Sequence, residues 1–187
     1  MESFEYLLIL ASVVLGLAVT DLATSLHRLL AAGGRVKWDW LAPLAAMVAF
    51  LKIVTQWWSW RAAASMAGGF TFEMFLGVLV ATVLLFLMAA AALPDEAGEV
   101  DLAAHYEAVR RRFWTLFVGH WLLMNGVSVW AQMQIAHARL SPLSLVLLLG
   151  PLALTMVFVR NRWVHTAVLA GLCVVYVGQF LGRGLPS

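Results

Sequence analysis

Three ionisable side chains lie inside long apolar runs of this sequence: Asp21, Lys52 and His120. Ionisable groups within membrane helices are costly, normally face other helices, and often line ion or proton pathways. Histidine exchanges protons near neutral pH. The amides that extend this set are Gln56, Asn125 and Gln132. Together these residue types predict a polar track that carries a proton or a small ion.

The depths of the three ionisable residues favour a shared track. At about 1.5 Å of rise per residue, Asp21 lies about 10 Å inside the helix end marked by Arg28, and His120 lies about 10 Å into its own run. Lys52 lies deeper, at about 18 Å, but helical side chains lean toward the N-terminus. Because a pair costs less than an isolated charge, we expect Asp21 and Lys52 to approach within ion-pair or one-water range.

Each polar residue also has a purely structural interpretation. Asp21 can be hydrogen-bonded near a helix end, and Lys52 can extend its amine to the interface or form a structural ion pair. His120 can form an interhelical hydrogen bond instead of binding a haem or a metal. The amides can join helices as packing contacts. The cluster Trp57-Trp58-Ser59-Trp60 is typical of an interfacial belt, with an aromatic ligand site as the alternative.

The composition requires that lipid surrounds most of the chain. Of 187 residues, 63% are hydrophobic and 12% are charged, with a mean hydropathy of +0.90. A soluble domain of this size carries roughly a quarter charged residues. The net charge of +2 does not indicate binding to nucleic acid. The single cysteine, Cys173, excludes a disulfide framework within one chain and a cysteine-rich metal site.

The predicted fold is an all-α polytopic transmembrane bundle, with residues 1–187 forming one domain. A spanning helix needs roughly 20 apolar residues. Glycine or proline separates most of the runs, as at Gly33-Gly34 and Pro94. The six expected spanning helices cover residues 6–30, 40–60, 70–93, 113–136, 143–159 and 163–181.

The distribution of cations predicts the orientation. Of twelve Lys and Arg residues, eight fall after the first, third and fifth helices, three fall on the other side, and Lys52 lies within a helix. The positive-inside rule then places loop 94–112 in the cytoplasm and both termini outside it.

Loop 94–112 has a helical pattern of its own. Leu102, Tyr106, Val109 and Phe113 recur at helical spacing, and Asp101 is placed to cap them. We expect a short interfacial helix on the cytoplasmic surface. The alternative is an extension of the fourth spanning helix.

Small residues indicate where helices pack closely. In the first helix Ser12, Gly16 and Thr20 are spaced four apart, and Gly119 and Gly126 serve a similar purpose in the fourth. The packing partner is either another helix of this chain or a second copy.

Several short motifs carry a resemblance to known sequences: Phe4-Glu5-Tyr6-Leu7-Leu8, Val14-Leu15-Gly16-Leu17-Ala18, Gln56-Trp57-Trp58, Pro94-Asp95, Asp101-Leu102 and His105-Tyr106. With these motifs the chain resembles an uncharacterised bacterial family of six-helix integral membrane proteins. It implies a bacterial cytoplasmic membrane, and no activity comes with it.

Three classes of function remain open at this point. The first is a channel or transporter for a proton or small ion, using the polar track between the first, second and fourth helices. The second is a membrane-embedded interaction or assembly subunit, with a second copy or another membrane subunit as partner and structural polar residues. The third is a membrane enzyme, haem carrier or redox carrier. The first is our expectation. We expect no catalytic residue, metal or cofactor, because the sequence has no hydrolase or phosphate-binding motif.

Overall fold

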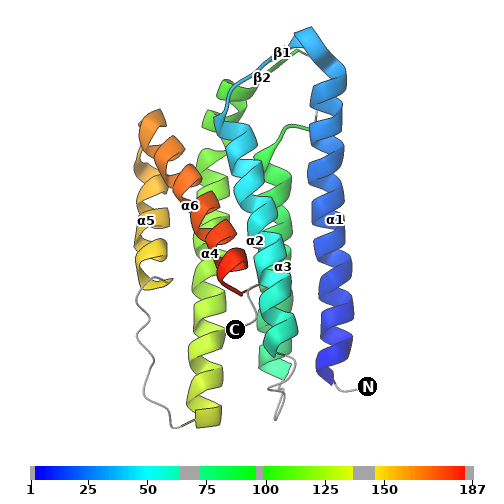
Figure 1. Cartoon of the computed structure of the whole chain (residues 1–187), viewed down its shortest axis with the longest axis vertical. Coiled ribbons are helices and arrows are strands. Elements are labelled where there is room, and N and C mark those ends of the chain that lie inside the picture. Colours follow the sequence, from blue (N-terminus) through cyan, green and yellow to red (C-terminus); the bar gives the residue numbers. More distant parts are fainter. Residues whose placement is uncertain (1–2, 64–71, 96–98, 137–145, 184–187) are drawn as a thin grey trace.

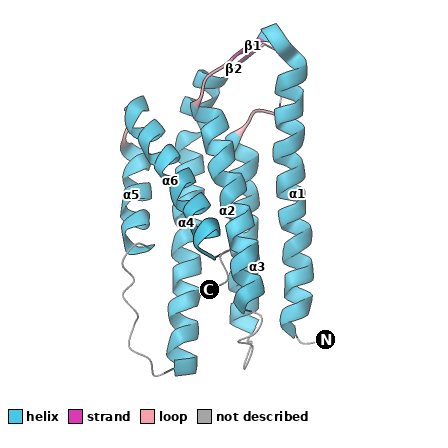
Figure 2. Cartoon of the chain, viewed as in Figure 1, coloured by secondary structure: helices cyan, strands magenta, loops and turns pink. Residues whose placement is uncertain are grey.

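The structure is a computed structural model that describes residues 3–63, 72–95, 99–136 and 146–183. Helices dominate these residues (Figure 2). The other elements are a 3-10 turn, η1 (Gly33–Arg35), and two short strands, β1 (Val36–Lys37) and β2 (Val100–Asp101), paired in parallel. The helices are α1 (Ser3–Ala32), α2 (Leu41–Ala63), α3 (Phe72–Ala92), α4 (Leu102–Ala136), α5 (Val146–Phe158) and α6 (Arg162–Arg183).

Successive helices run in opposite directions, so their ends collect at the two ends of a bundle (Figure 1). Helix α3 packs against both α1 and α4, α6 packs on α2, and α5 packs on α4. The pairing of β1 with β2 ties the α1–α2 connection to the α3–α4 connection. We call the end that carries β1 and β2 the basic end, because exposed cations gather there, including Arg28, Arg35, Lys37, Arg111 and Arg112.

Local chemistry explains where the helices begin and end. Gly33 has a φ of 57°, a conformation that disfavours side chains, and it ends α1. Pro94 follows the end of α3. At the start of α4, Oδ1 of Asp101 accepts hydrogen bonds from the backbone N–H groups of Ala103 and Ala104, at 3.0 and 3.1 Å. These contacts confirm the cap predicted at Asp101.

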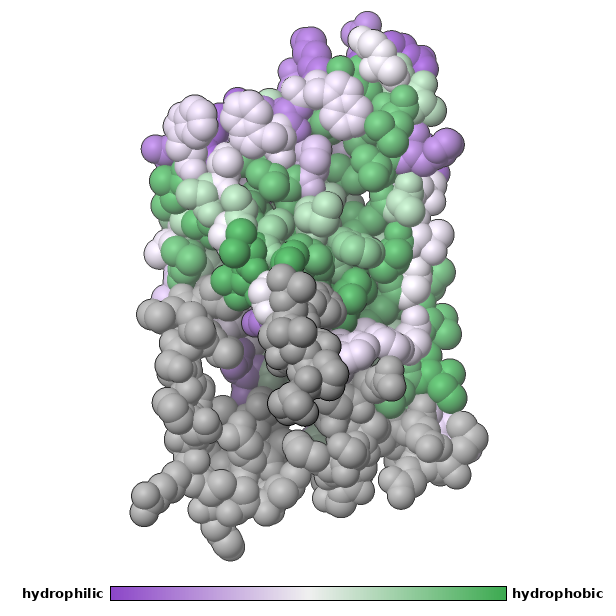
Figure 3. Space-filling model, in the orientation of Figure 1, coloured by the Kyte–Doolittle hydropathy of each residue, from purple (hydrophilic) through white to green (hydrophobic). Residues whose placement is uncertain are grey.

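Three helices are long and apolar enough to cross a membrane: α1, α2 and α3, over Tyr6–Arg35, Leu41–Trp60 and Phe72–Ala92. Their outward faces are apolar, and Figure 3 shows a broad hydrophobic band beside hydrophilic residues gathered at the basic end. The expected helices at 143–159 and 163–181 correspond to α5 and α6. Helix α5 has only 13 residues in the described part of the chain and contains Pro151.

In the described residues of loop 94–112, the alternative is confirmed: an extension of the fourth helix takes the place of a separate interfacial helix. Residues from Leu102 onward form the first turns of α4, which continues without a break to Ala136. The physical reason is that neither glycine nor proline occurs between Leu102 and Val118, so nothing stops the helix.

A buried polar network joins α4, α5 and α6 near the basic end. Arg110 is 2% exposed, and its guanidinium donates to the carbonyl oxygens of Val157 and Val159 at 3.3 and 2.8 Å. Its Nε donates to Glu107 at 2.9 Å. The last carbonyls of a helix lack partners within the helix and carry the negative end of its dipole. Arg110 therefore holds the C-terminal end of α5 against α4.

His165 completes this network from α6. Its Nε2 lies 3.0 Å from the carbonyl oxygen of Val159, so Nε2 carries the hydrogen and Nδ1 accepts. The hydroxyl of Tyr106 lies 2.8 Å from Nδ1, and Nε1 of Trp114 donates to Nδ1 at 3.2 Å. All three side chains are at most 2% exposed. The network therefore fixes the position of α6 relative to α4.

We predict that Arg110→Met destabilises the purified protein by roughly 3 kcal/mol, or about 6 to 12 °C, because charged hydrogen bonds to two carbonyls are lost. The apparent melting temperature in detergent measures this effect. Arg111→Met is the matched control, since Arg111 is exposed and a surface change alters stability by about 0.5 kcal/mol or less. Equal shifts for the two variants would contradict the tethering role of Arg110.

Candidate functional site

A buried hydrogen bond in the middle of the bundle joins α2 to α4. His120 on α4 is 1% exposed, and its Nε2 lies 3.1 Å from Oε1 of Gln56 on α2. Its other ring nitrogen, Nδ1, lies 3.0 Å from the carbonyl oxygen of Ala81 on α3. The imidazole on α4 therefore contacts two other helices, α2 and α3.

The partners of His120 determine how it can carry protons. A carbonyl oxygen only accepts, so Nδ1 carries a hydrogen and donates to Ala81. A neutral ring then offers a lone pair at Nε2, which needs the amide nitrogen of Gln56. A charged ring donates from Nε2 and needs the amide oxygen. Since a half-turn of the amide exchanges the two atoms, Gln56 can satisfy either protonation state of His120.

Lys52 lies one helical turn before Gln56 on α2 and belongs to the same polar cluster. Its Nζ lies 5.8 Å from the ring centroid of Tyr176 on α6, within cation–π range. The charge of Lys52 also acts on His120. We define Lys52, Gln56, His120 and Tyr176 as the interior polar cluster.

Asp21 lies elsewhere, on α1. The charge of Asp95 repels its carboxylate, and the charge of Arg28 attracts it. Next to it, Oγ of Ser25 donates to Oδ1 of Asp95 at 2.9 Å, and the guanidinium of Arg28 donates to the carbonyl oxygen of Asp95 at 3.1 Å. In the described part of the chain, no direct ion pair joins Asp21 to Lys52.

The remaining predicted track residues do not extend the interior polar cluster through described contacts. Asn125 donates from Nδ2 to the carbonyl oxygen of Trp121, at 2.7 Å within α4. Gln132 belongs to α4, but its side chain lies outside the described residues. In the tryptophan cluster, Trp57 is 40% exposed and donates from Nε1 to Oγ of Ser12 at 3.2 Å, whereas Trp60 is 6% exposed.

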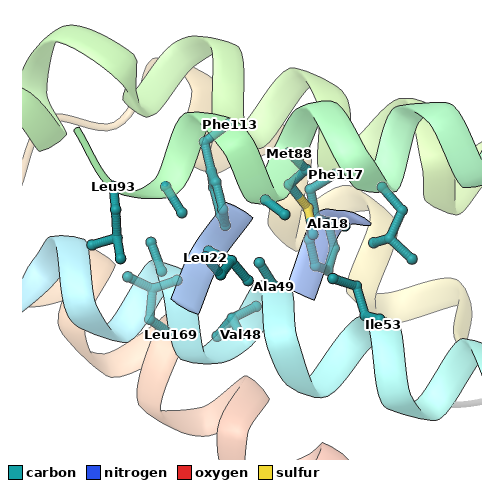
Figure 4. Close-up of a cluster of buried hydrophobic side chains, with 14 of the residues drawn as sticks. Ala18, Leu22, Val48, Ala49, Ile53, Met88, Leu93, Phe113, Phe117 and Leu169 are labelled. Carbon is teal, nitrogen blue, oxygen red and sulfur yellow. The ribbon is translucent and has the colours of Figure 1, made fainter. Parts of the chain in front are cut away.

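An apolar layer separates the interior polar cluster from the basic end. On α4, Phe113 and Phe117 lie between the first turns and His120, and both are at most 1% exposed. On α3, Met88 lies between the basic end and Ala81. Figure 4 shows these side chains packed with those of α1, α2 and α6, including Ala18, Leu22, Ala49 and Leu169.

A second titratable group lies on the basic side of this layer. His105, in the first turn of α4 and outside the candidate spans, has a buried Nε2 with no hydrogen-bond partner among the described residues. Burial lowers the pKa of His105, and the carbonyls of Ala91 and Ala92 and the carboxylate of Asp95 partly oppose this effect. The imidazole is therefore held toward its neutral form.

The packing residues divide between the interior and the surface. A Cβ at Gly119 would lie 3.8 Å from Leu84 on α3, so that glycine packs within the bundle. Ser12, Gly16 and Thr20 are exposed along α1, and a methyl group added at Gly16 or at Gly126 would have no described neighbour within 4 Å. Beside Ser12 an open groove of about 460 Å³ is lined by Leu8, Ile9, Ser12, Val13 and Trp57.

Sequence reasoning did not find the network of Arg110, Tyr106, Trp114 and His165. The signal in the sequence is the spacing of Tyr106, Arg110 and Trp114, each four residues apart and therefore on one helix face. His165 carries no such signal, because its proximity to that face depends on how α6 packs.

The comparisons with known proteins add no relative. No family model, no curated protein and no solved structure matches the chain. Within the residues that the structure describes, no group of three or more His, Cys, Asp or Glu side chains could hold a metal ion.

We predict that Gln56 and His120 are energetically coupled. In a double-mutant cycle with Gln56→Leu and His120→Leu, the coupling should lie between about 0.6 and 1.7 kcal/mol, the range of hydrogen bonds between membrane helices. Denaturation in mixed micelles measures each stability. The matched control pairs Gln56→Leu with Asn125→Leu, whose amide bonds its own helix, and should be additive. A coupling near zero for Gln56 and His120 would refute the interhelical hydrogen bond.

Proposed function

We propose that this protein is a small transporter or channel of a bacterial cytoplasmic membrane that moves a proton or small ion through the interior polar cluster between α2 and α4. The observation that carries the proposal is the contact of His120 with Gln56 beside Lys52, deep among apolar side chains. A bundle that needs only stability can pack apolar residues at these positions at no desolvation cost.

The chemistry of the contact supports proton or ion transfer. Gln56 can accompany a change of protonation at His120 by turning its amide, so neither state leaves a buried group without a partner. Lys52 adds a titratable amine within one turn of α2. Ionisable groups at this depth are typical of ion pathways and proton relays.

The apolar layer supports a gated path. Phe113 and Phe117 lie between the interior polar cluster and the basic end, where Asp21, Asp95 and His105 gather. Hydrophobic constrictions close membrane pathways by excluding water. In this proposal the layer opens only transiently, and Asp21 belongs to the basic mouth of the path.

We further propose that all six helices cross the bilayer, with the basic end in the cytoplasm and both termini outside. The alternating helix directions support this arrangement (Figure 1), and so does the gathering of exposed cations at the basic end.

The orientation predicts which cysteines react. On a Cys173→Ser background, Glu99→Cys should resist an impermeant maleimide added outside intact cells and react after the membrane is opened, because the α3–α4 connection is cytoplasmic. Ser3→Cys, at the other end of the bundle, is the matched control and should react in intact cells. Labelling of Glu99→Cys in intact cells would overturn the orientation.

Liposomes that contain the purified protein should pass protons, cations or halides faster than empty liposomes when a gradient is imposed. His120→Leu should lower this flux at least about tenfold, which corresponds to 1.4 kcal/mol in the barrier, because it removes the group that Gln56 and Ala81 hold. His27→Asn, a histidine exposed at the basic end, should leave the flux unchanged. Flux equal to that of empty liposomes for every ion would refute transport.

The second candidate is a membrane-embedded assembly subunit. The observation that favours it is the exposed stripe of Ser12, Gly16 and Thr20 beside the open groove at Trp57. Small residues let another helix approach closely. Liposomes without flux, together with an oligomer in detergent that Gly16→Ile dissociates, would establish this candidate in place of transport.

A further inference from the structure

We propose that the interior polar cluster binds a small inorganic anion of the halide class, with Lys52 as its counter-charge. The inference deepens the proposed function, because it assigns the sign and chemical class of the ion at the same site. It rests on three observations: the absence of a described carboxylate near Lys52, the donor groups around its amine, and the contrast with the basic end.

No described carboxylate neutralises Lys52. The ion pairs of the described residues are Lys37 with Asp101, Arg110 with Glu107, and Arg162 with Asp39, and all lie near the basic end. Asp21, the acidic residue expected to serve, has the Arg28 guanidinium as its favourable charge and the Asp95 carboxylate as an unfavourable one. Lys52 is therefore a partly buried amine whose described polar neighbours are uncharged.

The contacts of Lys52 leave its hydrogens available. Among the described residues, its Nζ lies over the face of the Tyr176 ring, 5.8 Å from the ring centroid. An aromatic face attracts a cation but accepts no conventional hydrogen bond. An ammonium has three donors and no acceptor. The Tyr176 side chain is 4% exposed, and its hydroxyl is a donor. A small anion between α2 and α6 would accept from both groups.

The same geometry disfavours a cation at this site. Lys52 would repel it, and the acceptor oxygens of Gln56 and Ala81 are already engaged with His120. A charge within lipid needs a partner of opposite sign or loses its proton. Since no described residue supplies that partner, a bound anion keeps Lys52 charged.

The test is the thermal stability of the purified full chain in detergent, titrated with sodium bromide at constant ionic strength against sodium gluconate. A ligand that binds only the folded state raises the melting temperature. We expect a rise of about 3 °C or more once bromide exceeds its dissociation constant tenfold. Lys52→Met, which keeps an apolar stem of similar length, should abolish the rise, and Lys52→Arg should retain it. Lys37→Met, at an exposed lysine, is the matched control and should behave like the wild type.

Three results would overturn the inference: no bromide-dependent rise in the wild type, an equal rise in Lys52→Met, or a rise that follows the cation when potassium replaces sodium. The liposome assay separates this outcome from failure of the proposed function. Proton or cation flux without bromide stabilisation would refute the anion site alone, whereas bromide stabilisation without flux would establish the site and refute transport.

Discussion

An apolar interior offers few hydrogen bonds to a buried polar group, and the arrangement of the polar side chains in this bundle follows from that constraint. Burying such a side chain is costly unless it finds a partner in the protein. His120 does so through Ala81 on α3 and Gln56 on α2, and Arg110 does so through the last carbonyls of α5. These contacts are directional, so they fix how the helices are rotated and shifted against one another, which apolar packing alone does less strictly.

The interior polar cluster differs from the basic end in how its charges are satisfied. At the basic end, cations meet carboxylates or carbonyls, as Arg162 meets Asp39 and Arg28 meets the carbonyl oxygen of Asp95. Lys52 lies over the aromatic face of Tyr176, and its charge acts on the His120 imidazole. The apolar layer of Phe113 and Phe117 keeps the two regions apart. Lys52 therefore has no described counter-charge and lies beyond the apolar layer. This feature connects the transport proposal with the anion inference.

Much of the local structure was predictable because its causes are local. The positions of α1, α2 and α3 follow from apolar runs bounded by Gly33 and Pro94, and the cap at Asp101 follows from its place before a helical pattern. Helical spacing in loop 94–112 fitted both a separate interfacial helix and an extension of the fourth helix. The extension is confirmed, because no glycine or proline interrupts residues 102–118. The position of Asp21 along its helix placed it near the level of the other polar residues. That position did not give the direction in which its side chain points.

Hydrophobicity, helix breakers and caps act over a few residues, so the amino-acid sequence alone establishes that the chain is helical, that some helices are apolar enough for a membrane, and that a few polar residues lie within them. Which of those polar residues meet is set by the packing of the helices. Helix α2 packs against α4, so Gln56 reaches His120, whereas Asp21 on α1 lies in the field of Asp95 and Arg28. Helix α6 packs on α2 and brings Tyr176 to Lys52. These pairings depend on the rotation of each helix about its axis and on its neighbours, which no local pattern specifies.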